Sequence, residues 1–178
     1  MPLNLLKKYP QLLEIGHLPE YQRNQSLLAI FKRDIEENKI LNFRTKIIRP
    51  IQGEEPAMVI LFKHLTCEEI QEDDQNGQKY PKRIFEITRS QRLHWIKYHL
   101  EENKKENVFI FSVEERDQKK RQNIIRTYIY GADQKYIIVL DPQRSLRDYY
   151  LVTAYYLNKE FGEKKVIKMM KNKLPNVF

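Results

Sequence analysis

The fold is decided by one stretch in the second half of the chain, Ile124-Ile125-Arg126-Thr127-Tyr128-Ile129-Tyr130-Gly131-Ala132-Asp133-Gln134-Lys135-Tyr136-Ile137-Ile138-Val139-Leu140. Two runs rich in Ile, Val, Tyr and Thr flank a short polar segment, a pattern typical of two strands joined by a hairpin turn. A similar run lies on each side, Val108–Val113 before the stretch and Tyr149–Leu157 after it. The connections are too short for crossover helices, so we expect a four-stranded antiparallel meander.

Apolar residues at helical spacing predict helices on both sides of these strands. We expect the sheet to pack one face on the helix that begins at Ser90 and to leave its other face free. The predicted class is therefore α+β, with N-terminal helices, a late sheet and a C-terminal basic helix. The expected helices are Leu3–Tyr9, Pro19–Glu37, Glu55–His64, Ser90–Lys105 and Glu163–Leu174.

Weaker signals lie between the helices. Thr45–Arg49 and Arg83–Ile87 each predict a short strand. The acidic run Glu68–Gly77 is rich in turn-forming residues, and we expect it to be a mobile loop.

Charge is distributed unevenly along the 178 residues, which carry a formal net charge of +8. Residues 1–82 contain 12 basic and 12 acidic side chains, whereas residues 83–178 contain 20 basic and 12 acidic ones. We divide the chain into a helical N-terminal region, 1–82, and a basic domain, 83–178, and expect them to form one compact unit. A basic domain favours a polyanionic partner, although a basic surface can also serve solubility alone.

Several classes of protein are excluded by what the sequence lacks. No apolar run approaches the ~20 residues of a bilayer helix, and no secretory signal is visible. The single cysteine, Cys67, excludes an internal disulfide and a cysteine-based zinc cluster. There is no glycine-rich phosphate loop and no metal-binding motif. We therefore expect a cytoplasmic protein with no metal, no cofactor and no membrane partner.

The basic half offers the side chains that a metal-free ribonuclease needs. The ribose 2′-hydroxyl attacks the neighbouring phosphate, which requires a general base, a general acid and a fixed cation. His94 is the first candidate for acid–base catalysis and His64 the second. The helix from Ser90 places His94 and His99 on different flanks, so the two should not share a site.

Residues on one sheet face are candidates for binding RNA. Strand alternation places Arg126, Tyr128 and Tyr130 together, and it places Thr153 with Tyr155. Arginine holds phosphate and tyrosine rings stack on bases, although a tyrosine-rich sheet can also be purely structural. Lys119, Lys120 and Arg121, in a charged segment between two strands, are further candidate contacts to the RNA backbone or simply a solvated loop.

The order of elements, together with Arg92-Leu93-His94-Trp95-Ile96 and Tyr150-Leu151-Val152-Thr153-Ala154-Tyr155, resembles a known family. It looks like the phage-type branch of the barnase, EndoU, colicin and RelE-like ribonuclease superfamily, over roughly Arg83–Lys159. The resemblance implies metal-independent RNA cleavage on an open sheet face and a role as a toxin or phage-derived effector. It makes Arg92, His94, Arg126, Thr153 and Tyr155 the site candidates, and it implies no copy of the barnase mechanism.

These observations lead to three functional hypotheses. The first is a metal-independent endoribonuclease acting on RNA such as tRNA or rRNA, in which Arg92 and Arg126 bind the scissile phosphate. The second is a non-catalytic RNA-binding or partner-binding module on the same fold. The third is a protein whose basic half docks an acidic partner such as an inhibitor or antitoxin.

Overall fold

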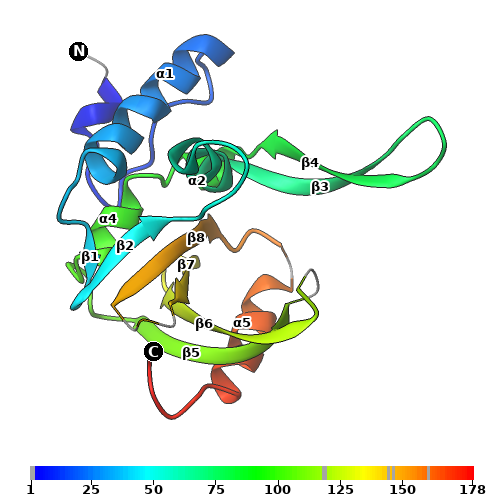
Figure 1. The fold of residues 1–178 in the computed structure, drawn as a ribbon. Coiled ribbons are helices and arrows are strands. Elements are labelled where there is room, and N and C mark those ends of the chain that lie inside the picture. The colour runs from blue at the N-terminus through cyan, green and yellow to red at the C-terminus, as the bar shows by residue number, and fades with distance from the viewer. Residues whose placement is uncertain (1–2, 118–119, 144, 146, 160) are drawn as a thin grey trace.

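The computed structural model describes residues 3–117, 120–143, 145, 147–159 and 161–178 and shows an α+β fold (Figure 1). The predicted class is confirmed. The helices are η1 (Leu3–Leu6), α1 (Glu20–Phe31), η2 (Lys32–Glu36), α2 (Ala57–Thr66), α3 (Ile87–Ser90), α4 (Trp95–Leu100) and α5 (Gly162–Lys171). The strands are β1 (Asn42–Phe43), β2 (Lys46–Pro50), β3 (Cys67–Asp73), β4 (Lys79–Phe85), β5 (Val108–Asp117), β6 (Gln122–Gly131), β7 (Tyr136–Pro142) and β8 (Asp148–Tyr156).

The main sheet is larger than the four antiparallel strands expected from the sequence. It has six strands in the order β1-β2-β8-β7-β6-β5 and is mixed, because β2 pairs in parallel with β8. The pairs β5–β6, β6–β7 and β7–β8 are antiparallel. The parallel pair joins Ile47–Pro50 to Asp148–Leu151, about a hundred residues apart, and local sequence patterns carry no information on such a pairing.

The acidic run expected as a mobile loop is instead part of a two-stranded arm. β3 and β4 pair antiparallel from Cys67–Phe85 to Asp73–Lys79, and Figure 1 shows this hairpin projecting away from the main sheet. Cross-strand ion pairs balance the acidic charge, among them Glu72 with Lys82 at 2.9 Å. The turn is closed by the Asp74 carboxylate, which accepts the backbone N–H groups of Asn76 and Gln78.

Two short helices take the place of the helix predicted from Ser90 to Lys105, and the first of them, α3, begins before it at Ile87. The start of α3 is capped by Glu86, whose carboxylate accepts the backbone N–H groups of Thr88 and Arg89. α3 ends at Ser90, four residues of turn follow, and α4 ends at Leu100. Of the predicted N-terminal helices, Leu3–Tyr9 contains only η1. The helix predicted over Pro19–Glu37 is present over nearly its whole length, as α1 followed at Lys32 by the π-helical turn η2.

Both faces of the main sheet are buried, where the sequence led us to expect one free face. On one face, side chains such as Ile129, Ile138 and Leu151 form a core with Phe31 of α1 and Leu61 of α2. Residues from both parts of the chain, 1–82 and 83–178, therefore share this core, and residue 82 itself lies inside β4.

The second face carries its own apolar cluster. Phe111, Tyr128, Ile137 and Val139 pack there with Val166 of α5. Figure 1 shows α5 on the side of the sheet opposite α1. The C-terminal helix thus covers the face that the sequence analysis assigned to an open site.

The segment after α5 is fixed to the sheet by buried hydroxyl groups. The backbone N–H of Phe178 donates to Ser112 Oγ at 3.0 Å, and Thr127 Oγ1 donates to the Phe178 carbonyl at 2.9 Å. Ser112 Oγ and Thr127 Oγ1 lie 2.8 Å apart, and because the Thr127 proton is used on Phe178, Ser112 is the donor between them. The Tyr149 hydroxyl donates to the same carbonyl.

We predict that Thr127→Val destabilises the protein by roughly 1–3 kcal/mol, because it leaves the buried Ser112 hydroxyl without an acceptor and removes one donor from the Phe178 carbonyl. The measurement is urea unfolding followed by circular dichroism. Thr45→Val, at an exposed threonine, is the control and should change the free energy of unfolding by less than about 0.5 kcal/mol. Equal effects of the two variants would show that the hydrogen bonds of Ser112 and Thr127 with Phe178 do not stabilise the C-terminal segment.

Candidate functional site

His94 and His99, which follow α3, are buried and lie apart from the sheet face that α5 covers. His94 is only 6% exposed, and it lines a pocket formed with the N-terminal residues Leu5–Tyr9 and with Arg33 and Asp34. Burial lowers the pKa of His94 to about 4. At neutral pH the ring is therefore uncharged and shielded from solvent.

His99 is packed among aromatic rings. It is 2% exposed, its ring lies 5.7 Å from that of Tyr136 and 5.4 Å from that of Tyr9, and neither nitrogen has a hydrogen-bond partner among the described residues. A Cβ at Gly131 would stand 3.4 Å from this ring, so the hairpin backbone passes close to His99 at a glycine. Burial lowers the pKa of His99 to about 4 as well.

His64 lies in the last turn of α2, beside the part of β8 that pairs with β7 but no longer with β2. Its Nδ1 donates to the Val152 carbonyl at 3.1 Å, which fixes the neutral ring in the Nδ1–H form. Burial is the main cause that lowers the pKa of His64, and the neighbouring Arg83 adds to it. The carbonyl oxygen of His64 accepts from two further groups, Arg89 Nη1 at 2.8 Å and Thr153 Oγ1 at 3.0 Å.

Arg89 is the centre of the polar contacts in this region. Besides the His64 carbonyl, its Nη1 donates to the Cys67 carbonyl at 2.6 Å and to Thr153 Oγ1 at 3.4 Å. The guanidinium carbon lies 5.4 Å from the centre of the Tyr155 ring. Nε has no partner among the described residues. Burial lowers the pKa of Arg89, and nearby Glu86, Tyr155 and Glu68 oppose that change.

Arg89 lines a cavity of about 240 Å³ between α3, the covered sheet face and α5. Of the residues predicted from the sequence, Tyr128 and Tyr155 line it, and Thr153 reaches it through its contact with Arg89. Burial raises the pKa of both tyrosines, so both phenols are protonated at neutral pH. The charged residues in the wall are Glu68, Glu86, Arg89, Lys159 and Lys165.

The two predicted phosphate-binding arginines are engaged elsewhere. Arg92 lies over the Tyr156 ring at 4.0 Å, and its Nη1 donates to the Thr88 carbonyl. Arg126 forms ion pairs with Asp141 at 2.9 Å and with Glu115 at 3.8 Å. Glu115 also accepts from the Tyr128 hydroxyl at 3.0 Å, so Arg126 is connected to the cavity wall through two side chains.

The other predicted RNA contacts are separate from the cavity. Tyr130 is 4% exposed and belongs to the apolar cluster that α5 joins. Lys120 and Arg121 are exposed before β6, and Lys120 borders a groove that Phe178 also lines. Lys119 lies outside the described residues. The structure therefore brings Thr153, Tyr155 and Tyr128 together with Arg89, and places His64 next to them.

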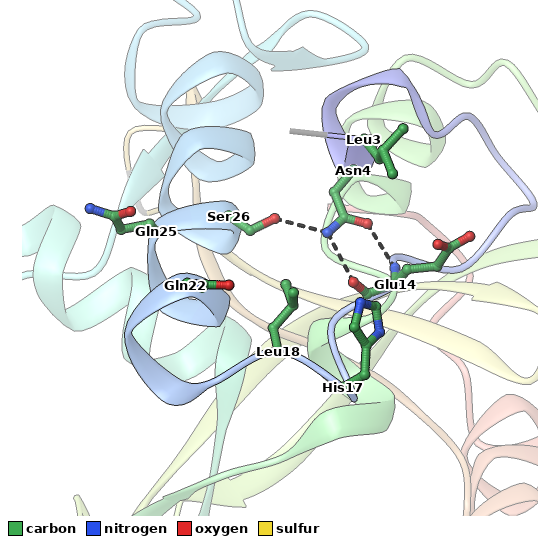
Figure 2. A pocket seen from close by; sticks show the side chains of 8 residues that line it. All are labelled: Leu3, Asn4, Glu14, His17, Leu18, Gln22, Gln25 and Ser26. Carbon is green, nitrogen blue, oxygen red and sulfur yellow. Dashed lines mark hydrogen bonds between the residues drawn. The ribbon is translucent and has the colours of Figure 1, made fainter. Parts of the chain in front are cut away.

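A second hollow lies between η1, the following loop and α1. Figure 2 shows Asn4 bridging the two sides, with Nδ2 donating to Ser26 Oγ at 2.9 Å and to the Glu14 carbonyl at 3.2 Å. Asn4 Oδ1 accepts the Glu14 backbone N–H at 2.7 Å. Glu14 itself pairs with Lys7. The buried amide of this hollow is satisfied internally and its carboxylate is paired, so the Arg89 cavity is the stronger candidate site.

Arg89 was missed by the sequence analysis. Its available signal was the segment Glu86-Ile87-Thr88-Arg89-Ser90, in which an acidic cap at the start of a short helix fixes the direction of the following arginine. The sequence analysis started the helix at Ser90 and so left Arg89 outside it.

Comparisons with protein-family models, with curated proteins and with solved structures found no match for this chain. Within the described ranges, no helix is long and apolar enough to span a bilayer. In the same residues, no three side chains of His, Cys, Asp or Glu gather as a metal site would require.

We predict that acid weakens folding through His94 and His99. Each has a pKa of about 4 in the folded protein against 6.5 ordinarily, so between these values the unfolded chain binds more protons. Above pH 6.5 the two histidines do not lower the free energy of unfolding. As the pH drops toward 4, this free energy falls by roughly 3 kcal/mol for each histidine. The measurement compares urea midpoints at pH 7.5 and pH 4.5.

His99→Leu should reduce this loss, whereas His17→Ala, at an exposed histidine, should leave it intact. A pH profile of His99→Leu identical to that of the parent would contradict the assignment of the acid effect to buried imidazole.

Proposed function

We propose that this protein is a metal-independent endoribonuclease that holds the scissile phosphate of RNA in the Arg89 cavity. One observation carries the proposal. A half-buried guanidinium on a cavity wall is positioned by three protein oxygens, yet in the part of the chain that the structure describes it forms no ion pair with a carboxylate.

Such a cation favours an anionic ligand. Burying a charge without a paired opposite charge costs several kcal/mol, and an anion that enters the cavity recovers much of this cost. The Glu86 carboxylate is already used on the backbone at the start of α3, so it is a poor competitor for the guanidinium. Arginine is also the side chain best suited to phosphate oxygens, because its N–H groups form a fixed fork.

The cavity wall supplies groups for both proton transfers. In the proposed reaction the 2′-oxygen attacks phosphorus, its proton passes to the Glu68 carboxylate, and the 5′-oxygen leaves with a proton from the Tyr155 hydroxyl. The products are a 2′,3′-cyclic phosphate and a free 5′-hydroxyl. Burial keeps Tyr155 protonated and therefore able to donate, and Arg89 lies against its ring to stabilise the phosphorane charge.

Thr153 acts on Arg89 rather than on RNA. Its hydroxyl proton is used on the His64 carbonyl, and its oxygen accepts from Nη1 of the arginine. His64 contributes through its backbone carbonyl, while its ring borders a separate hollow with Glu55 and Arg83. In this scheme the histidines first suggested as acid and base are replaced by Glu68 and Tyr155.

A non-catalytic RNA-binding module is the second candidate, and one observation favours it. Glu68 lies 3.5 Å from the ammonium of Lys159, and no imidazole among the described residues lines the cavity. A carboxylate held by a lysine is a weaker base, and a binding module needs only the cations and the aromatic rings. The proposals of a phage or toxin context, a cytoplasmic location and an acidic inhibitor partner rest on the family resemblance and the net charge alone.

We predict that the parent protein cleaves RNA in excess EDTA, leaving 2′,3′-cyclic phosphate ends, and that Tyr155→Phe slows cleavage by about 10²–10⁴-fold through loss of the proton donor. Glu68→Gln should act in the same direction. Arg89→Lys keeps the positive charge but removes the paired N–H donors of the guanidinium, and we expect cleavage to be slower by about 10²–10³-fold. Gel analysis of RNA fragments provides the rates.

Arg23→Lys is the matched control, because Arg23 also lies over an aromatic ring, Phe85 at 3.9 Å, but does not line the cavity. It should cleave at the parental rate. RNA that is bound by the parent but never cut would favour the binding module, and cleavage by Arg89→Lys at the parental rate would refute the proposed phosphate site.

A further inference from the structure

The outer face of α5 is a row of lysines. Val166 at the centre of the helix is buried against the sheet, whereas Lys164, Lys168 and Lys171 are exposed on the opposite side of the helix. Their spacing of four and three residues aligns them over two turns, with a rise of roughly 10 Å from first to last.

None of these three lysines has an ion pair within the described ranges. Many of the cations elsewhere do, such as Lys63 with Glu55, Lys104 with Asp133 and Arg49 with Asp148. The only acidic residue inside α5 is Glu163, which pairs with Lys135 at 3.0 Å. The lysine row is therefore a line of uncompensated positive charge.

The row lies on the side of α5 that faces away from the Arg89 cavity, and Lys165, which is exposed and lines the cavity, lies between the two on the helix surface. Lys165, Gly162 and Met169, on the same helix, form part of the wall of the Arg89 cavity. Phe161, just before the helix, is 67% exposed, and the Lys164 ammonium lies 5.5 Å from its ring centre. An exposed aromatic ring beside a line of cations is the arrangement that proteins use to bind single-stranded nucleic acid.

We propose that Lys164, Lys168 and Lys171 hold the backbone of single-stranded RNA where it leaves the Arg89 cavity, with Phe161 as a stacking platform for a base. This inference rests on the proposed function, because it extends the same site. It names the substrate class: an unpaired RNA segment that extends from the cavity of about 240 Å³ to the outer side of α5.

An anionic membrane is the competing partner for a basic helix, and the structure favours RNA. The apolar side chains Val166, Met169 and Met170 of α5 face the sheet, so they cannot enter a bilayer. The exposed side of α5 retains Ile167 and the neighbouring Phe161 as its large apolar groups, which is little for membrane insertion.

The test is the salt dependence of binding. The probe is a 12-nucleotide single-stranded RNA with 2′-O-methyl groups, which removes the attacking hydroxyl and prevents cleavage. Each lysine–phosphate contact contributes about 0.7 to the slope of log K against log salt for a single strand. The variant Lys164→Gln/Lys168→Gln/Lys171→Gln should therefore lower the slope by about 2 and weaken binding at low salt.

The control is Lys32→Gln/Lys39→Gln/Lys105→Gln, which removes the same charge from exposed lysines that are likewise outside the described ion pairs. Its slope should equal that of the parent. Equal slopes for all three proteins would overturn the proposal, as would loss of binding to phosphatidylserine vesicles with RNA binding unchanged.

Cleavage of a dinucleotide by the parent protein tests the proposed reaction separately from the proposed lysine row. The dinucleotide contains a single phosphodiester and no further strand to bind the lysine row, so it tests the proposed reaction without that row. Cleavage together with equal slopes would overturn the lysine row and leave the reaction standing. No cleavage together with the expected loss of slope would refute the reaction and retain the row as an RNA-binding surface.

Discussion

The guanidinium of Arg89 joins α3 to two segments that are distant from it in sequence, the junction of α2 with β3 and the middle of β8, and the candidate site depends on it. It donates to the His64 carbonyl in the last turn of α2, to the Cys67 carbonyl at the start of β3 and to the Thr153 hydroxyl on β8. Carbonyls at the end of a helix have no partner within the helix, and an arginine is well suited to satisfy them. The same contacts occupy the edge of β8 beyond the residues that pair with β2. One side chain thus closes a helix end and positions a cation at the cavity.

The strands themselves explain why α5 must cover the second sheet face. Tyr136–Leu140 of β7 is an unbroken apolar run, and all five residues are buried. Such a run is typical of a strand with both faces covered, whereas an alternating run is typical of a strand with one face in water. A free second face would expose Ile137, Val139 and Phe111 together. The cavity therefore lies between α5 and the sheet rather than on an open surface.

The strands β5 to β8 were predictable because each is a local run bounded by turn residues. The continuous apolar run of β7 was also visible, and it should have argued against a free face. The parallel pairing of β2 with β8 had no local signal, and the β3–β4 arm was hidden by acidic residues whose partners lie on the opposite strand. For the site, alternation placed Tyr128 and Tyr155 on the correct face. Arg89 could not be found by motif, because its role arises from carbonyls far along the chain.

Net charge alone says little about where a polyanion binds, because a paired cation is already neutralised locally. Arg126 belongs to the basic half, yet Asp141 and Glu115 compensate its charge. Unlike Arg126, Arg89 and the lysines of α5 have no such carboxylate partner in the described part of the chain. An unpaired cation in a cavity binds one phosphate group strongly, whereas a row of exposed lysines contributes salt-dependent affinity spread along a strand. Under the proposed function, the Arg89 cavity is the reaction site and the α5 lysines are a separate surface for the rest of the RNA strand.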